Sequence, residues 1–356
     1  MRIRWLSLLV FLVAVLGSSL VQAQNVTITP LGAQAGEFCA GDRALLFEDP
    51  TGVKVLIAPG RTVGADLGAF VSGSADTRLG GSVHVLLIDH PHVDHIGDVF
   101  HTNCGGTTSK AFEFPTEGNA PEIAARLNSA VLVGGELPDY FTKKLNNMVT
   151  LAGTVAPVNC PAAGLDNTFT VPRVSPCVGV IRGGTRTAVM SGASEGVKIT
   201  TIPAFHAGGV ARIHVDPLPD GTDPGVPEGL TGYAGSETGY IIRFTNGLSV
   251  LWTGDSGLIG DWATQAKFYG VNLAVVHGGD LFTMGPDEAA FAVNQLIKPR
   301  SVIPEHFNQI STTKGQVNAG TRLERFKQQL KGQVQSRVVV PLSGVPISCN
   351  GKGNCS

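Results

Sequence analysis

The chain has 356 residues, of which 43% are hydrophobic and 15% charged, and it includes 46 glycines and 21 prolines. This length allows one large domain or two small ones, and the glycine and proline content argues against a helical bundle and favours a turn-rich α/β protein. The formal net charge is −2 and no basic stripe is present, which argues against a nucleic-acid partner.

Residues 1–23 have the pattern of a secretory signal peptide. A positively charged start precedes the apolar run Trp5–Leu16, and Val21-Gln22-Ala23 is typical of a cleavage site. Cleavage after Ala23 would remove the positive charges of Arg2 and Arg4 and change the formal charge from −2 to −4. We expect a periplasmic or secreted protein without stable membrane insertion after cleavage; an uncleaved membrane anchor is the alternative.

The mature chain contains six cysteines, and an even number in an exported protein favours disulfide bonds. Cys349 and Cys355 close a short loop of glycine and asparagine, so we pair them. Cys160 and Cys177 bracket a loop that contains proline and are paired next, which leaves Cys39–Cys104 by elimination. The spacing of these cysteines fits no zinc-finger pattern.

The first part of the chain is predicted to form strands. Val26–Leu31 alternates in hydrophobicity, which is typical of a strand. Arg43–Phe47 and Val53–Ile57 flank the turn sequence Asp49-Pro50-Thr51-Gly52, which predicts a hairpin. The apolar and partly β-branched run Val83–Ile88 predicts a buried strand.

The stretch from 101 to 195 is less regular. We expect helices over Ala120–Leu132 and Asp139–Met148. Thr154–Thr187 is rich in proline, glycine, valine and threonine, and we interpret it as a surface excursion with loops. The whole of about 101–195 is therefore treated as an extended insertion and not as a separate domain.

Regular elements return after residue 195. The Asn246-Gly247 turn predicts a second hairpin between Gly239–Phe244 and Leu248–Trp252. Further strands are expected over Val197–Ile202, Leu273–Val276, Val302–Ile303 and Arg337–Val340. Helices are expected over Ile259–Phe268, Asp287–Ile297 (with Pro286 at its start) and Thr321–Leu330. Strands followed by helices, twice over, predict an α/β fold with two sheets between helix layers, in a domain spanning 24–346 with a C-terminal tail at 347–356.

The segment from Ile88 to Asp98 places three imidazoles and three carboxylates within eleven residues. It contains the pattern H-x-H-x-D-H, formed by His90, His92, Asp94 and His95, directly after a predicted strand. Neutral imidazole and carboxylate are ligands that hold zinc, iron or manganese. A loop can direct such side chains toward one point, whereas alternate residues of a strand face opposite ways. The pattern therefore predicts a metal site in this loop.

Three further ligand-type residues follow predicted strands in the same way: His206, Asp255 and His306. Each of them alone would more often be an ordinary loop residue, but together they repeat one pattern. If the strands lie side by side, their ends converge at one edge. We then expect two cations, the first held by His90, His92 and His206, the second by Asp94, His95 and His306, with Asp255 bridging both.

Such a pair of cations has a known chemical use. Two divalent cations about 3.5–4 Å apart can share a water, and a single zinc can lower the pKa of bound water from about 15.7 to about 7. The second cation can hold the substrate oxygen and take up developing negative charge. We expect two divalent ions, zinc first and manganese or iron as alternatives, and a small-molecule substrate.

The ordered motifs between Val26 and Leu342 resemble the metallo-β-lactamase superfamily of metal-dependent hydrolases. Thr253-Gly254-Asp255-Ser256-Gly257 is similar to the bridging-aspartate motif of that family. The segments Gly278–Ala290 and Val302–Phe307 resemble the branch that contains L-ascorbate-6-phosphate lactonase and N-acylphosphatidylethanolamine phospholipase D. The resemblance implies a four-layer αββα sandwich and the same ligands, namely His90, His92, Asp94, His95, His206, Asp255 and His306.

The chain departs from this resemblance in three places. Many relatives carry an aspartate in the segment Leu56–Gly60, where this chain has Ala58, so the ligands are expected to be oriented less tightly. The stretch His101–Glu195 is longer than in that branch and is expected to shape the substrate pocket. His277 stands where relatives often have a small or apolar residue. We assign His277 as a candidate substrate-binding side chain, with a buried strand-end histidine as the alternative.

The main hypothesis is an exported dinuclear hydrolase in which a metal-bound hydroxide attacks an ester, lactone or amide carbonyl. Asp94 is expected to orient that hydroxide and to shuttle a proton to the leaving group. A phosphodiester is the second substrate class, and a β-lactam is a weaker one. Iron-dependent redox chemistry on the same fold is a rival, although the flavin domain typical of di-iron reductases is missing. A non-catalytic binding protein is a third alternative, against which the complete ligand set argues.

Overall fold

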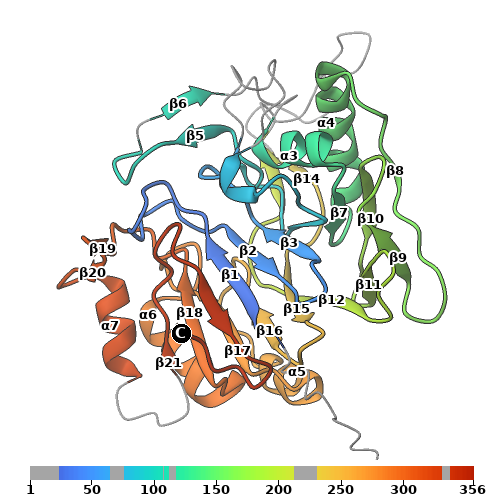
Figure 1. Cartoon of the computed structure of the whole chain (residues 1–356). Coiled ribbons are helices and arrows are strands. Elements are labelled where there is room, and N and C mark those ends of the chain that lie inside the picture. The colour runs from blue at the N-terminus through green and yellow to red at the C-terminus, as the bar shows by residue number, and fades with distance from the viewer. Residues whose placement is uncertain (1–23, 65–75, 107, 112–117, 212–230, 331–336) are drawn as a thin grey trace, which may run out of the picture.

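Figure 1 shows the computed structural model of the chain, in which residues 24–64, 76–106, 108–111, 118–211, 231–330 and 337–356 are described. Two eight-stranded mixed sheets form the centre of this part of the chain. Helices cover the outer side of each sheet, so the order of layers is helix, sheet, sheet, helix. The expected αββα sandwich is confirmed.

The first sheet is built mainly from the N-terminal half of the chain. Its β1–β2–β3 part is antiparallel, and β3, β4, β7 and β10 are parallel neighbours. In spatial order its strands are β22 (Ile347–Cys349), β1 (Val26–Pro30), β2 (Leu45–Glu48), β3 (Lys54–Ile57), β4 (Val85–Ile88), β7 (Ala130–Val133), β10 (Cys177–Val180) and β8 (Val158–Asn159).

The second sheet has a parallel part whose strand ends precede three of the seven predicted ligands, His206, Asp255 and His306. β16, β17 and β18 run in parallel, and β12 runs the same way as β16 because both are antiparallel to β15. The carboxyl ends of these four strands therefore lie at one edge. The order is β21 (Arg337–Val338), β18 (Ser301–Glu305), β17 (Leu273–His277), β16 (Ser249–Trp252), β15 (Thr238–Arg243), β12 (Gly196–Pro203), β11 (Thr185–Met190) and β9 (Thr168–Val171).

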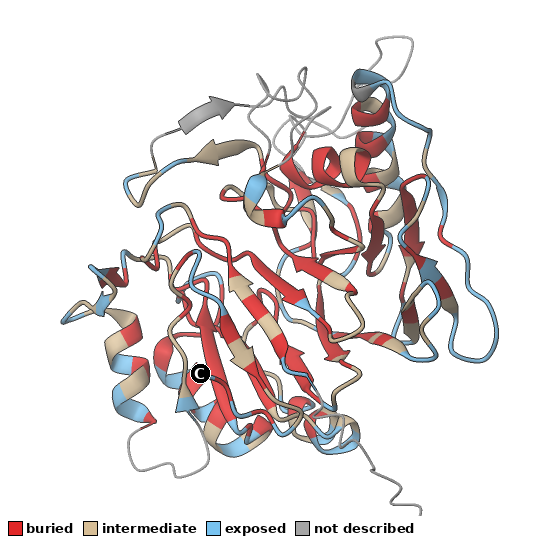
Figure 2. Cartoon of the chain, in the orientation of Figure 1, coloured by how far each residue is buried: buried red, intermediate tan, exposed pale blue. Residues whose placement is uncertain are grey.

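The layers follow from the two apolar faces of each central strand. Along β4, Val85 and Leu87 pack between the sheets, whereas Leu86 and Ile88 pack against helices. A strand buried on both faces has a continuous apolar sequence, and Figure 2 shows buried residues running along both sheets. The first sheet is covered by α3 (Asn119–Leu127) and α4 (Leu137–Ala152), and the second by α5 (Trp262–Tyr269), α6 (Pro286–Phe291), the π-helical turn η3 (Ala292–Ile297) and α7 (Arg322–Gln329).

Short elements complete the described part of the chain. They are the 3₁₀ turn η1 (Thr77–Leu79), the helical turn α2 (Val93–Ile96), and the strand pairs β5 (Val99–His101) with β6 (Thr108–Ala111), β13 (Gly209–Ala211) with β14 (Thr231–Tyr233), and β19 (Thr312–Thr313) with β20 (Gln316–Val317).

Three expectations from the sequence are wrong. Ala130–Leu132, expected at the end of a helix, belongs to β7, because a fully buried strand has the same apolar run as a buried helix segment. The stretch 154–187 is not a surface excursion, since it supplies β8 and β10 to the first sheet and β9 to the second. Ile347–Cys349, expected in a tail, is the edge strand β22 and pairs with β1.

The three predicted disulfide bonds are formed, Cys39–Cys104, Cys160–Cys177 and Cys349–Cys355. The predicted hairpins β2–β3 and β15–β16 are also confirmed. Among the described residues, no helix combines the length and apolarity needed to cross a bilayer. The expected signal peptide at 1–23 lies outside the described residues.

Two hydrogen bonds tie the second sheet to the strand end that carries the histidine motif. The hydroxyl of Tyr240, on β15, donates to the carbonyl oxygen of Ile88 at 2.7 Å, and the Thr238 amide donates to the Asp89 carbonyl at 3.2 Å. Tyr240 is fully buried. The two sheets are thus registered against each other at the end of β4.

Tyr240→Phe is expected to lower the free energy of unfolding by about 1–3 kcal/mol, because it leaves a buried carbonyl without its donor. Urea denaturation measures this difference. Tyr233→Phe is the matched control, since Tyr233 is 70% exposed, and it is expected to change stability by less than about 0.5 kcal/mol. Equal stability of the Tyr240→Phe protein and the unchanged chain would contradict the role of this bond.

Candidate metal centre

All seven side chains predicted as ligands come together at one edge of the sandwich. The motif leaves the end of β4, and the turn α2 brings Asp94 and His95 round to the same side as His90. His206 lies three residues after β12, Asp255 three residues after β16, and His306 directly after β18. Because those strands end at a common edge, residues more than 200 positions apart in the sequence become neighbours.

The first group of potential ligand atoms contains three histidines. His206 Nε2 lies 3.3 Å from His92 Nδ1 and 3.7 Å from Asp255 Oδ2, and His90 Nε2 lies 3.9 Å from the same oxygen. Four ligand atoms at about 2.0–2.1 Å from a tetrahedral zinc would be about 3.3–3.4 Å apart. The spacing between His206 and His92 matches this value, and the two spacings to Asp255 Oδ2 are longer, so the three histidines can surround one cation with Asp255 beside it.

The second group shares the same oxygen of Asp255. His95 Nε2 and His306 Nε2 each lie 3.3 Å from Asp255 Oδ2. Asp94 Oδ2 lies 3.5 Å from His306 Nε2 and 3.9 Å from His95 Nε2. These distances fit a tetrahedron, and Asp255 is common to both groups.

Donor nitrogens in both groups are short of protein partners, and two of the rings are neutral. Within the described part of the chain, His90 Nε2 and His95 Nε2 are buried without a hydrogen-bond partner, and buried nitrogens are rarely left in that state. Burial, together with the rings of His90 and His206, lowers the pKa of His92 to about 4, and burial also lowers the pKa of His206. Both rings are therefore neutral near pH 7, with a lone pair available.

The acidic side chains are ionised. Burial alone would raise the pKa of Asp94, but the Arg43 guanidinium and the rings of His95 and His306 hold it well below the usual range. The pKa of Asp255 is lowered in the same way by His306 and His95, against the effect of burial. Burial would lower the pKa of His95, yet the surrounding carboxylates raise it well above its usual value. The carboxylates that favour a proton on His95 would equally favour a divalent cation, which would take the place of that proton.

Asp89 orients two of the histidines. Its carboxylate is 2% exposed, and its two oxygens lie 2.8 Å from His90 Nδ1 and 2.9 Å from His95 Nδ1. A ring that donates from Nδ1 directs the lone pair of Nε2 to the opposite side, toward Asp255. Ala58 was expected to leave the ligands loosely oriented. Asp89, which stands next to His90 in the motif, orients His90 and His95 instead.

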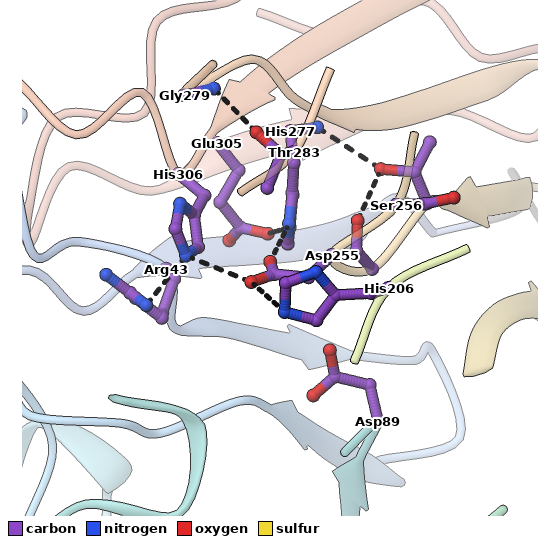
Figure 3. A network of polar contacts seen from close by, with 12 residues as sticks. Arg43, Asp89, His206, Asp255, Ser256, His277, Gly279, Thr283, Glu305 and His306 are labelled. Carbon is purple, nitrogen blue, oxygen red and sulfur yellow. Dashed lines mark hydrogen bonds and ion pairs between the residues drawn. The ribbon is translucent and has the colours of Figure 1, made fainter. Parts of the chain in front are cut away.

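A second set of contacts orients Asp255 from the other side, as Figure 3 shows. His277 Nδ1 lies 2.7 Å from Asp255 Oδ1, and His277 Nε2 lies 2.9 Å from Glu305 Oε2. Trp252 Nε1 donates to the same Glu305 oxygen at 2.6 Å. His277 is fully buried with both ring nitrogens engaged. This corrects the expectation that His277 binds substrate: it positions Asp255, and its side chain does not reach the pocket.

Backbone features hold His206 and His306 in place. The Phe205 amide donates to Ser256 Oγ at 3.0 Å, and the Gly257 amide donates to the Phe205 carbonyl at 2.9 Å, so the loop of His206 is fixed to the loop of Asp255. His306 has φ of 51°, a conformation that is uncommon for residues other than glycine and that recurs at functional sites. This turn of the backbone directs the ring toward Asp255.

A pocket of about 720 Å³ opens above the centre. His92, Asp94, His206, Asp255 and His306 form part of its lining, so the ligand groups are accessible to a small molecule. The Cys39–Cys104 disulfide lies in one wall. Of the described part of 101–195, only residues between His101 and Gly106 line this pocket. Three arginines also contribute: Arg43, Arg61 and Arg322.

Four contributors were not predicted from the sequence: Asp89 as an orienting group, Arg43, Glu305 and the pocket position of His101. Asp89 stands inside the motif, so its spacing could have identified it as a partner of the neighbouring rings. Glu305 directly precedes His306. Neighbouring residues at the end of a strand face opposite ways, so Glu305 lies behind the ligand and not beside it. Arg43 is separated from Asp94 by 51 positions, and no local pattern indicates the contact.

Comparison with known proteins agrees with the fold and the centre. The family model described as "Beta-lactamase superfamily domain" matches residues 55–307. That range contains every ligand candidate and most of both sheets. The chain therefore belongs to this family.

Individual relatives are distant but cover most of the chain. A UPF0173 metal-dependent hydrolase of Cupriavidus necator is 26% identical over 315 residues, covering 88% of this chain and 86% of that protein. Another, of Cupriavidus taiwanensis, is 25% identical over 346 residues, covering 95% and 98%. Among solved structures, a metallo hydrolase of Ignicoccus hospitalis KIN4/I has a TM-score of 0.52 at 20% identity, covering 91% of this chain and 98% of that one. At that identity the structural match supports the fold alone.

Asp89→Asn is expected to weaken metal binding about 10- to 100-fold, because an amide cannot accept from both rings and the ligands lose their orientation. Competition with a chromophoric chelator measures the affinity. Asp98→Asn is the matched control, since Asp98 lies in the same segment but pairs with Arg61 at 2.6 Å. Unchanged affinity in the Asp89→Asn protein would show that Asp89 does not orient the ligands.

Proposed function

We propose that this metal-dependent hydrolase acts on an ester, lactone or amide carbonyl and uses two divalent cations, with zinc the first choice. The observation that supports the proposal is a pair of ligand groups, one of three histidines and one of Asp94, His95, Asp255 and His306, which meet at Asp255 Oδ2 in the lining of a pocket. His90, His92 and His206 would hold one cation. Asp94, His95 and His306 would hold the other.

The chemistry divides between the cations and the chain. Bound divalent cations would activate a water and polarise the substrate oxygen. Asp94 is ionised and lines the pocket, so we assign it to orient the attacking water and to pass a proton to the leaving group. Asp89 and His277 act as positioning residues. The buried Trp252–Glu305 pair keeps His277 in place behind Asp255.

A phosphodiester is the second candidate substrate. The support for it is the presence of Arg43, Arg61 and Arg322 in the pocket lining, because guanidinium groups recognise phosphate well. The branch that the sequence resembles contains a lactonase and a phospholipase D, so it offers a precedent for each of the two substrate classes. Iron-dependent redox chemistry is the remaining rival, and the metal content distinguishes it from hydrolysis.

We also propose that the protein is exported. The support is the signal-peptide pattern of residues 1–23 together with the pairing of all six cysteines in disulfides, which are favoured in oxidising compartments. Its site of action would then be the periplasm or the medium.

His92→Ala and Asp255→Ala are expected to remove bound metal and hydrolysis together, because each change takes a ligand atom from a group of four. Metal content is measured by mass spectrometry, and turnover on a panel of a lactone, an ester, a phosphodiester and a β-lactam. His84→Ala is the control, because His84 Nδ1 accepts from the Lys54 amide at 3.0 Å and stands at the other end of β4.

Retained turnover in the absence of metal would end the proposal. Iron content together with oxygen consumption would favour the redox rival. Turnover of the phosphodiester alone would reverse the order of the two substrate classes.

Mass analysis of the mature protein is expected to give an N-terminus at Gln24, because cleavage is predicted after Ala23. Expression in a bacterial host with separation of cytoplasmic and exported fractions provides the sample. A chain that stays in the cytoplasm and retains residues 1–23 would contradict export.

A further inference from the structure

An arginine stands directly beside the second ligand group. Arg43 lies between β1 and β2, its side chain is 5% exposed, and its Nη1 contacts Asp94 Oδ2. The same Nη1 lies 2.8 Å from His306 Nε2. Figure 3 shows the side chains of Arg43 and His306 facing each other. Arg43 also lines the pocket. A buried positive charge is thus placed where the second cation would sit or very close to it.

Arg43 and a bound cation would compete for the same lone pairs on Asp94 and His306. A guanidinium has only N–H donors and no acceptor, so the atoms facing Nη1 are acting as acceptors. His306 Nε2 and Asp94 Oδ2 are the same atoms that complete the second ligand group. A cation bound there would need both lone pairs, and it would have to displace Arg43 or tolerate its charge at close range.

The first ligand group has no such competitor. In the described part of the chain, the side chain of Arg43 bonds to the Gly41 carbonyl, Asp94 and His306, and not to His90, His92 or His206. By ligand charge alone the second group would be the stronger one, because it contains Asp94 in addition to Asp255. Pairing with Arg43 cancels that advantage.

Arg43 is carried by a fixed loop. The carboxylate of Asp42 is buried and accepts from the Cys39 amide at 2.8 Å and from the Ala33 amide at 2.9 Å. The Cys39–Cys104 disulfide joins this loop to the segment His101–Gly106, which also lines the pocket. The backbone of Arg43 is therefore held close to the centre.

We infer that Arg43 makes the two metal sites unequal: the three-histidine site fills first, and the site of Asp94, His95 and His306 binds its cation much more weakly. This inference rests on the proposed function. At low free metal the guanidinium remains beside Asp94 and supplies a positive charge to the same pocket. The second site then fills only as the free metal concentration rises.

Calorimetric titration of the metal-free full chain with Zn²⁺ tests this, with zinc counted by mass spectrometry after dialysis. The unchanged chain is expected to bind one tight equivalent and a second at least about tenfold weaker, since a unit charge within about 4 Å is worth more than a factor of ten in affinity. Arg43→Gln is expected to narrow this difference by raising the affinity of the second site. Arg322→Gln is the matched control, because Arg322 lines the same pocket but donates to the Phe307 carbonyl at 3.3 Å, and it is expected to titrate like the unchanged chain.

Two equal equivalents in the unchanged chain, or an unchanged difference in Arg43→Gln, would overturn the inference and leave the proposed function standing. A chain that binds no zinc at all would overturn both. If circular dichroism shows that Arg43→Gln does not fold, Arg43→Met gives the same comparison. Methionine also removes the positive charge and the N–H donors, so the difference between the two affinities should narrow, and an equal difference would count against Arg43.

Discussion

The centre depends on one electrostatic constraint, the convergence of four imidazole nitrogens on a buried carboxylate oxygen. Asp255 is 3% exposed, and its Oδ2 lies within 3.9 Å of Nε2 atoms from His90, His95, His206 and His306. Buried groups of this kind need protons or cations between them. The direction of the parallel strands brings these atoms to one edge, and the loops after the strands fix them there.

Two buried carboxylates support this convergence from opposite sides. Asp89 orients His90 and His95 from the first sheet, and Glu305 acts through His277 on Asp255 from the second. Each removes the freedom of a ring to turn its lone pair away. The sheet-to-sheet bond of Tyr240 to the end of β4 keeps the two halves in register.

Much of the fold and the ligand set could be predicted because their signals are local. Alternating hydrophobicity, the Asn246-Gly247 turn and the H-x-H-x-D-H pattern each depend on a few adjacent residues. The strands β7 and β10 were missed, since a strand buried on both faces loses the alternation that identifies it. Arg43 and the orienting role of Glu305 could not be predicted, because their partners are set by the packing of distant segments and not by spacing along the chain.

Anomalous X-ray diffraction from crystals grown with zinc is the most direct test of the central claim. Two peaks are expected, one on either side of Asp255 Oδ2. One should lie among His90, His92 and His206, and a second, of lower occupancy at low zinc, among Asp94, His95 and His306. Zinc bound elsewhere, with no peak beside Asp255, would contradict that claim.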